Sequence, residues 1–265
     1  MGVKVSNTRS VVEATIDRVD LFSTWPDDVK AELRTAAELW TFSKGEVVLQ
    51  AGEPAHSVVV IVEGSLVNER AYANGKHMMT AVLRPGWPLK VPAVLNGLGV
   101  PFGLTARVDC LVLFIPKQKF LDIVNSQIEL LQNVTNFIGL QYHQDMVSLQ
   151  LRTMASLECQ FALLMIFHAQ DAAHLIDEDR GVSNTNVLDV TQEEFASMLG
   201  CSRQKINVIM KQMERDGLIE RHGRLVEIIN YVGLLELIEQ EDPVHHDFRT
   251  AIEIWQERLE QSKSH

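Results

Sequence analysis

The segment from Thr191 to Ile219, TQEEFASMLGCSRQKINVIMKQMERDGLI, constrains the fold of this chain most strongly, because it predicts two short helices joined by a tight turn. Thr191 followed three residues later by Glu194 is a capping box, which starts a helix by satisfying backbone N–H groups that would otherwise lack acceptors. Gly200 supplies the permissive backbone that a sharp turn needs. The first helix is therefore expected to begin after Thr191 and to end at Gly200.

The second helix is expected from about Ser202 to Arg215, with one apolar face and one polar face. Its apolar stripe has the i, i+3, i+4, i+7 spacing of a helix packed on one side. The stripe comprises Ile206, Ile209, Met210 and Met213. Side chains on the other face can reach base edges or phosphates once such a helix enters a major groove. The candidate DNA-binding residues of this segment are Ser202, Arg203, Gln204, Lys205, Asn207, Val208 and Lys211.

A β-hairpin is predicted after the second helix. Asp216-Gly217 ends the helix, and Gly223 lies in a turn between two short β-prone segments. This hairpin, or wing, carries Arg221, His222 and Arg224, of which His222 and Arg224 are further candidate DNA-binding residues. The combination predicts a winged helix-turn-helix, and the alternative is a purely structural helical hairpin.

Composition allows two domains and disfavours several classes of protein. A chain of 265 residues with 46% hydrophobic content can build two cores. The three cysteines are far apart and form no C-x-x-C pair, so neither a disulfide framework nor a metal site is expected. No nucleophile-elbow, zinc-protease or Walker sequence occurs, so we do not expect an enzyme. The chain has no bilayer-spanning apolar stretch and no signal-peptide core at its start, so we expect a cytoplasmic protein without a membrane partner.

The net charge of −11 at first disfavours nucleic acid as a partner, because phosphate neutralisation supplies most nonspecific affinity. The distribution of charge answers this objection. Between Ser202 and Arg215 basic residues outnumber the single acid Glu214, whereas the last thirty residues are rich in Asp and Glu. Basic charge is therefore concentrated where a DNA groove would lie.

The front half, from Leu21 to Phe120, consists of short β-prone runs separated by turn residues, as in VVLQ, SVVVIV, SLVNERAY, KHMMTAVL and CLVLFIP. This spacing predicts an antiparallel sandwich or barrel, with Asn74-Gly75 as a hairpin turn. From Lys119 the pattern becomes helical for more than thirty residues. A heptad-like stripe on this helix predicts pairing with a second subunit, and packing on the chain's own β domain is the alternative. The candidate dimerisation residues are Ile128, Leu131, Thr135, Ile138, Tyr142, Asp145 and Leu149.

In this order of elements, and in the landmarks FSKGEVVLQAGEPA, VVVIVEGSL, LRPGW, CLVLFIP and TQEEFASMLGCSRQKI, the chain resembles the Crp/Fnr superfamily of bacterial transcription regulators over roughly residues 20–230. The resemblance implies an α+β fold with an N-terminal antiparallel β-roll, which is a jelly-roll-like double-stranded β-helix, a long dimerisation helix and a C-terminal winged helix-turn-helix. An extra C-terminal helix is expected beyond it. The expected parts are an N-terminal arm (1–20), the effector or sensor roll (21–124), the dimerisation helix (125–152), the DNA-binding domain (153–235) and an acidic amphipathic extension (236–265).

The resemblance also implies function. It predicts a homodimer that binds a near-palindromic operator in double-stranded DNA and recruits RNA polymerase, and it favours activation over repression. Arg203, Gln204 and Asn207 or Val208 then read bases, with Ser202 near a phosphate. Cyclic AMP receptors often have glutamate and arginine where this chain has Gln204 and Val208, which leaves the operator sequence open.

The effector site departs further from the family pattern. Cyclic-nucleotide members carry a glutamate and an arginine in a phosphate cassette, but the corresponding stretch here, Trp87 to Ala106, contains neither. Its lining is apolar with one cation, which predicts a small hydrophobic or aromatic effector, including an acid paired with Lys90. The candidate pocket residues are Trp87, Leu89, Lys90, Val91, Leu95, Phe102 and Leu104 from this stretch, with Ile138 and Tyr142 from the long helix. The alternative is that the same residues form ordinary core and the protein acts without a ligand.

Other interpretations of the sensor remain open alongside this one. No cofactor is expected, and an iron–sulfur cluster is not, because Met1 to Asp20 contains no cysteine. A cyclic nucleotide and haem are kept as alternatives, with His56, His77 and Cys110 as haem-ligand candidates by position. A different class of function is a ligand-sensing signalling or scaffold protein that uses the helical hairpin for protein contacts.

The C-terminal tail carries a further apolar stripe at helical spacing, which we expect to dock on the same dimer. Contact with another protein is the alternative. The stripe comprises Phe248, Ile252, Trp255 and Leu259.

Overall fold

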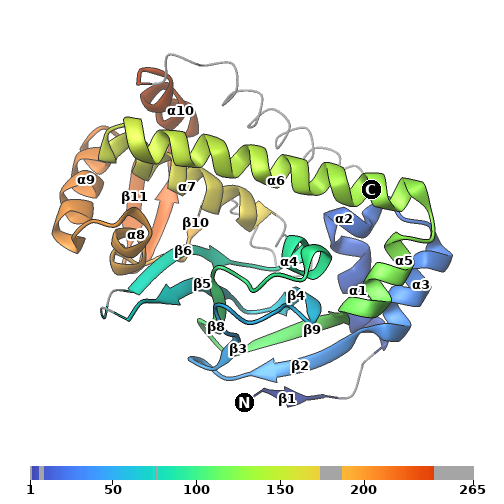
Figure 1. Cartoon of the computed structure of the whole chain (residues 1–265). Helices are drawn as coiled ribbons and strands as arrows, with labels where there is room; N and C mark the ends of the chain where they lie inside the picture. The colour runs from blue at the N-terminus through green and yellow to red at the C-terminus, as the bar shows by residue number, and fades with distance from the viewer. Residues whose placement is uncertain (1, 6–8, 74, 76, 174–186, 242–265) are drawn as a thin grey trace. The chain divides into compact units, whose positions relative to one another are not determined.

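The structure is a computed structural model that describes residues 2–5, 9–73, 75, 77–173 and 187–241 (Figure 1). The chain divides into two compact units, residues 1–140 and 141–265. The first contains the two larger β-sheets, and the second contains the helix-turn-helix.

Two antiparallel sheets form the roll of the first unit, as expected from the alternation of strands and turns. The five-stranded sheet has the order β1-β2-β9-β4-β7, and the four-stranded sheet has the order β3-β8-β5-β6. The strands are β1 (Val3–Lys4), β2 (Glu38–Phe42), β3 (Val47–Leu49), β4 (Ser57–Glu63), β5 (Leu66–Ala71), β6 (His77–Leu83), β7 (Pro88–Leu89), β8 (Gly103–Ala106) and β9 (Cys110–Pro116). The expected pairing around the Asn74-Gly75 turn is present as the β5–β6 ladder, although Asn74 itself lies outside the described residues.

The core of the roll has two layers, and β4 explains why. Val59 and Ile61 point into a cluster between the two sheets, where they meet Leu66 and Leu104 of the second sheet. The alternate residues Val58 and Val60 belong to a larger cluster on the other face of the first sheet. Because successive side chains of a strand point to opposite faces, a strand buried on both sides reads as a continuous apolar run.

Helices cover that outer face. They are α1 (Arg9–Arg18), α2 (Asp20–Ser23), α3 (Asp27–Ala36), α4 (Val91–Asn96) and α5 (Lys117–Val124). Within the expected N-terminal arm (1–20), the described residues contribute to the fold: β1 pairs with β2, and Val12 and Ile16 are buried in the cluster. Their contribution was not predicted, because a strand of two residues and a short helical pattern give little signal in the sequence.

The long helix is α6 (Ile128–Met154), and its beginning corrects one expectation. The sequence predicted continuous helix from Lys119, but a break at residues 125–127 separates α5 from α6. Ser126 Oγ donates to the carbonyl of Ile123 (2.7 Å), and the Asn125 amide donates to the carbonyl of Leu121. The bond of Asn125 is the last helical backbone bond of α5, whereas the side-chain bond of Ser126 competes with helix continuation. Burial of Ile123 and Val124 holds the end of α5 in the core.

The second unit is built around α7 (Leu157–Ala173), which contacts α8 (Gln192–Leu199), β10 (Val187–Leu188) and α10 (Tyr231–Glu239). The boundary expected between the dimerisation helix and the DNA-binding domain, after residue 152, lies close to the break between Met154 and Leu157. α9 (Arg203–Arg215) and the hairpin of β11 (Ile219–His222) and β12 (Leu225–Ile228) complete the unit, with β10 as a third strand in the order β10-β12-β11. The expected C-terminal helix, with Phe248, Ile252, Trp255 and Leu259, lies outside the described residues.

Within the described part of the chain, no helix combines the length and the apolar character that crossing a membrane requires.

Candidate nucleic-acid interface

The capping box predicted at Thr191 is present and fixes the start of α8. The Thr191 hydroxyl accepts from the Glu194 amide (3.2 Å), and the Thr191 amide donates to the Glu194 carboxylate (2.7 Å). At the other end Gly200 caps the helix with a left-handed backbone (φ +62°), which glycine adopts without strain. These two residues set where the chain turns into α9.

α9 is held from beneath by its buried stripe. Ser202 caps it by accepting from the Lys205 amide (3.3 Å), and the predicted residues Ile206, Ile209, Met210 and Met213 are all buried. Phe195 of α8 is fully buried, with its ring 4.9 Å from that of Phe161 in an edge-on contact. The packing presents the opposite face of α9 to solvent.

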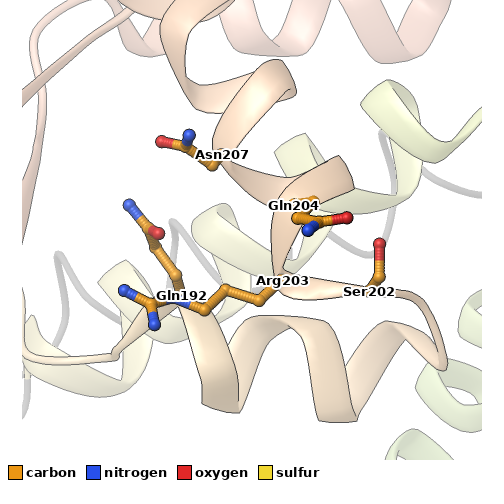
Figure 2. A pocket seen from close by; sticks show the side chains of 5 residues that line it. All are labelled: Gln192, Ser202, Arg203, Gln204 and Asn207. Carbon is orange, nitrogen blue, oxygen red and sulfur yellow. The ribbon is translucent and has the colours of Figure 1, made fainter.

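That outer face carries the predicted DNA-binding residues. Ser202, Arg203, Gln204, Lys205, Val208 and Lys211 are exposed, and Asn207 is half-buried. A hollow at the start of α9 is lined by Gln192, Ser202, Arg203, Gln204 and Asn207, and Figure 2 shows the Gln192 and Arg203 side chains reaching to the same side. Gln192 was not among the predicted residues. Gln192 directly follows Thr191, the N-cap of α8, and this position in the sequence could have indicated that it lies near the start of α9.

The wing contributes three cationic or titratable side chains, and each has a partner within the unit. Arg224 lies 3.2 Å from Asp189 while its side chain stays 73% exposed, and His222 Nε2 lies 3.1 Å from the Glu227 carboxylate. Arg221 turns toward α9, where it pairs with Glu214 and donates to Asn207. The free charges facing outward from this surface therefore belong mainly to α9.

In the roll, Lys90 has an unusual position. It is the one described non-glycine residue with positive φ (+65°), a conformation that costs a side-chain-bearing residue energy. Its amine donates to Asn68 Oδ1 (2.7 Å) and to the Phe102 carbonyl (3.0 Å), and both acceptors are neutral. Burial lowers the pKa of Lys90 to about 8. A half-buried cation without a carboxylate partner among the described residues is a candidate point of attachment for an anion.

The other predicted pocket residues differ in burial. Val91 and Leu104 are fully buried and belong to the two different core layers, whereas Trp87, Leu89, Leu95, Phe102 and Ile138 are half-buried. Trp87 packs on Phe137 of α6 with ring centroids 5.8 Å apart. Tyr142 is 64% exposed. The predicted lining is divided between the two core layers of the roll, with Trp87, Leu95 and Ile138 packed against one cluster and Leu89 against the other.

On α6, the two faces differ. Leu130, Val134 and Phe137 are buried against the roll. Most of the predicted dimerisation residues lie on the exposed face: Ile128, Leu131, Thr135, Tyr142, Asp145 and Leu149 are exposed, and Ile138 is half-buried. Ile128, Leu131 and Leu149 of this stripe are therefore exposed within the described chain.

The three haem-ligand candidates lie in different environments. His56 is exposed, His77 pairs with Glu69 at 2.8 Å, and Cys110 is buried, where burial raises the pKa of its thiol to about 11. Among the residues that the structure describes, no group of three or more His, Cys, Asp or Glu side chains could hold a metal ion.

A β-roll of this topology joined by a long helix to a winged helix-turn-helix defines a class of DNA-binding regulators. Comparison with known proteins agrees with that class. Residues 39–127 match the cyclic nucleotide-binding domain, and residues 162–237 match the Crp-like helix-turn-helix domain. The chain belongs to the Crp/Fnr family of transcriptional regulators.

Relatives align over most of their length. The chain is 20% identical to the cAMP-activated global transcriptional regulator CRP of Haemophilus influenzae, over 84% of this chain and 98% of that protein. It is 25% identical to the HTH-type transcriptional regulator Cmr of Mycobacterium tuberculosis, over 78% and 79%. These relatives are transcriptional regulators and not enzymes, as expected.

Solved structures show the same fold. FixK2 from Bradyrhizobium japonicum aligns with a TM-score of 0.64 at 15% identity, over 76% of this chain and 96% of that one. A CRP/FNR-family transcriptional regulator from Thermus thermophilus aligns with a TM-score of 0.58 at 19% identity, over 77% and 100%.

The family implies a cyclic nucleotide as one ligand, and the residues present do not fit it. Between Trp87 and Ala106 the only charged residue is Lys90. A ribose hydroxyl would find no carboxylate in this stretch, and a cyclic phosphate would find no guanidinium with two parallel donors. A single lysine supplies charge without that geometry.

Proposed function

We propose that this regulator acts as a homodimer that binds a near-palindromic operator and controls transcription in response to a small organic acid. The observation that best supports this proposal is the outer face of α9, where Arg203, Gln204 and Lys205 are exposed at the start of the helix. Arginine at that place is suited to the O6 and N7 acceptors of guanine. The alternative of a scaffold protein is less well supported, because a protein-contact face has no need of basic and amide groups at a helix start.

Dimerisation is supported by the exposed stripe of α6. A helix with one face on the roll and apolar residues such as Leu131 and Leu149 in solvent is expected to pair with a copy of itself. Two copies related by a two-fold axis would present two reading helices, and a near-palindromic operator would mirror that symmetry. By analogy with the family, we further propose contact with RNA polymerase and activation of the genes concerned.

Salt-dependent gel shift on a promoter fragment tests the DNA-binding proposal. The wild-type protein is expected to show a steep loss of affinity with rising salt, because bound phosphates release counterions. Arg203→Ala should lower operator affinity by about 1–3 kcal/mol, which is about 5-fold to 160-fold, and should affect random DNA much less. Equal losses on operator and random DNA would show that Arg203 reads no base.

The proposed effector is an acid with an apolar or aromatic body. Lys90 would pair with its carboxylate, and the half-buried apolar residues Trp87, Leu95 and Phe102 would contact its body. The same acceptors, Asn68 Oδ1 and the Phe102 carbonyl, hold the amine in place for this pairing.

Thermal-shift screening with aliphatic and aromatic carboxylates, each beside its neutral amide, tests the effector proposal. Acids should raise the melting temperature more than amides do, and Lys90→Met should remove the difference. Absence of a shift from any acid, together with full operator binding by the ligand-free protein, would support the alternative that this regulator acts without a ligand.

A further inference from the structure

Asn207, on the reading face of α9, is held by a residue of the wing. Arg221 Nη1 of β11 donates to Asn207 Oδ1 at 3.2 Å, across fourteen residues of sequence. Asn207 lines the same hollow as Arg203 and Gln204, so its side chain belongs to the surface that faces DNA in the proposed function (Figure 2).

The chemistry of the two groups fixes which way the Asn207 amide points. A guanidinium has five N–H donors and no acceptor, so only the amide oxygen, and not the NH₂ group, can face it. The oxygen of Asn207 is therefore directed to Arg221, and the NH₂ group is left to face away from the wing. An asparagine without such a partner would be free to present either end.

Arg221 is itself firmly placed. Its other terminal nitrogen pairs with the Glu214 carboxylate, about two helix turns after Asn207 along α9. The side chains of Arg221 and Glu214 are only 22% and 29% exposed. The pairing lowers the pKa of Glu214 and raises that of Arg221, so both groups stay charged near neutral pH. Arg221 of β11 is thus a cation held in place between Asn207 and Glu214 of α9.

This arrangement bears on base selection. An unconstrained asparagine pairs with adenine by donating to N7 and accepting from the N6 amino group at the same time. Here the accepting oxygen is engaged, and the positive guanidinium beside it disfavours a second donor such as the adenine amino group. Guanine instead offers two acceptors, O6 and N7, to the outward NH₂ group.

We propose that Arg221 is a positioning residue that locks Asn207 as a hydrogen-bond donor, so that this regulator selects guanine and rejects adenine at the base contacted by residue 207. The inference rests on the proposed function, because it requires α9 to enter the major groove.

Selection of binding sites from a randomised DNA library tests the proposal. The Asn207→Ala variant first identifies the base pair concerned, as the one position at which it loses discrimination. Wild-type protein is expected to prefer guanine over adenine on the contacted strand there by about tenfold, the size of a good base contact. Enrichment of adenine at that position in the wild-type selection would overturn the proposal, and this measurement needs no variant of Arg221.

Arg221→Met then tests the lock itself, because methionine keeps an apolar stem in the strand and removes every donor. The ratio of guanine to adenine should fall to about one, which is no preference, or should reverse toward adenine. The base preferences at the positions read by Arg203 should stay unchanged. Arg224→Met is the matched control, since Arg224 lies on the same wing but pairs with Asp189 and not with Asn207. It should weaken binding to all sites alike and leave the tenfold preference intact.

The outcomes separate this inference from the function beneath it. Unchanged guanine preference in Arg221→Met would overturn the lock and leave DNA reading by α9 in place. Failure of the wild-type protein to select any site would contradict the proposed function and the lock together. Loss of guanine preference in both Arg221→Met and Arg224→Met would show a general effect of wing charge, and it would also overturn the lock.

Discussion

The reading helix and the interior of the roll hold their cations in opposite ways. Arg203 stands in solvent at the start of α9, on ordinary helical backbone. Lys90 is half-buried, lies on left-handed backbone and bonds two neutral oxygens. A surface that meets a phosphate polymer keeps its charge hydrated until contact, because long-range attraction then assists association. A site for a small anion instead gains strength from a cation that is already partly desolvated before the ligand arrives.

The largest expected effect is a loss of stability in the unit that carries α9. Phe195→Ala should destabilise the second unit by about 3–5 kcal/mol, because loss of a fully buried aromatic ring leaves a cavity between α8 and α7. Operator binding should be lost with it. Thermal unfolding followed by calorimetry should show one transition lowered and the other unchanged.

Phe22→Ala is the matched control for that prediction. Phe22 is equally buried, but it lies in the first unit against Trp25 and Phe120. Its loss should lower the other transition. A single transition that both variants lower equally would contradict the independence of the two units.

The partial burial of Lys90 should make the stability of the protein depend on pH. The pKa of Lys90 is lowered from the ordinary 10.5 to about 8, so between these values the unfolded chain binds more protons than the folded one. The free energy of unfolding is therefore expected to rise as pH increases from about 8 to about 10.5, by roughly 3 kcal/mol in total from this residue. Urea unfolding across this range measures the slope.

The difference between wild type and Lys90→Met isolates that contribution. The variant should lack the rise, whereas Lys119→Met, which removes an exposed lysine paired with Glu32, should keep it. The free energy of unfolding of the wild type could instead fall over this pH range, or change with pH just as that of Lys90→Met does. Either result would contradict the description of Lys90 as a desolvated cation.

The smallest expected effect concerns the cap of α8. Thr191→Ala removes the acceptor for the Glu194 amide and should lower the stability of the second unit by about 1 kcal/mol. Thr191→Ser keeps the hydroxyl and should remain close to wild type. Equal losses in the two variants, measured by urea unfolding, would mean that the capping bond contributes little.

Local features of the DNA-binding unit could be predicted from the sequence. The capping box at Thr191, the turn at Gly200 and the stripe from Ile206 to Met213 are local features, and the structure confirms each of them. Local hydrogen bonds and helical periodicity are recorded within a few residues, so a sequence reveals them directly.

Features that depend on distant residues were harder to predict. The contact of Arg221 with Asn207 requires the wing to fold back on α9, and nothing in the spacing of the two residues signals it. The left-handed backbone of Lys90 and the short helix α4 were likewise missed, because six residues with a proline near the start give no periodic pattern. The break at Ser126 was missed because a single serine hydroxyl, rather than a proline or glycine, ends the helical run.

Footprinting of the purified protein on the DNA upstream of its own gene tests the central claim most directly. We predict protection of two half-sites related by a two-fold axis about one helical turn apart, with loss of protection in Arg203→Ala at protein concentrations that saturate the wild type. Protection without sequence preference, equal for wild type and Arg203→Ala, would contradict the claim that α9 reads DNA in this protein.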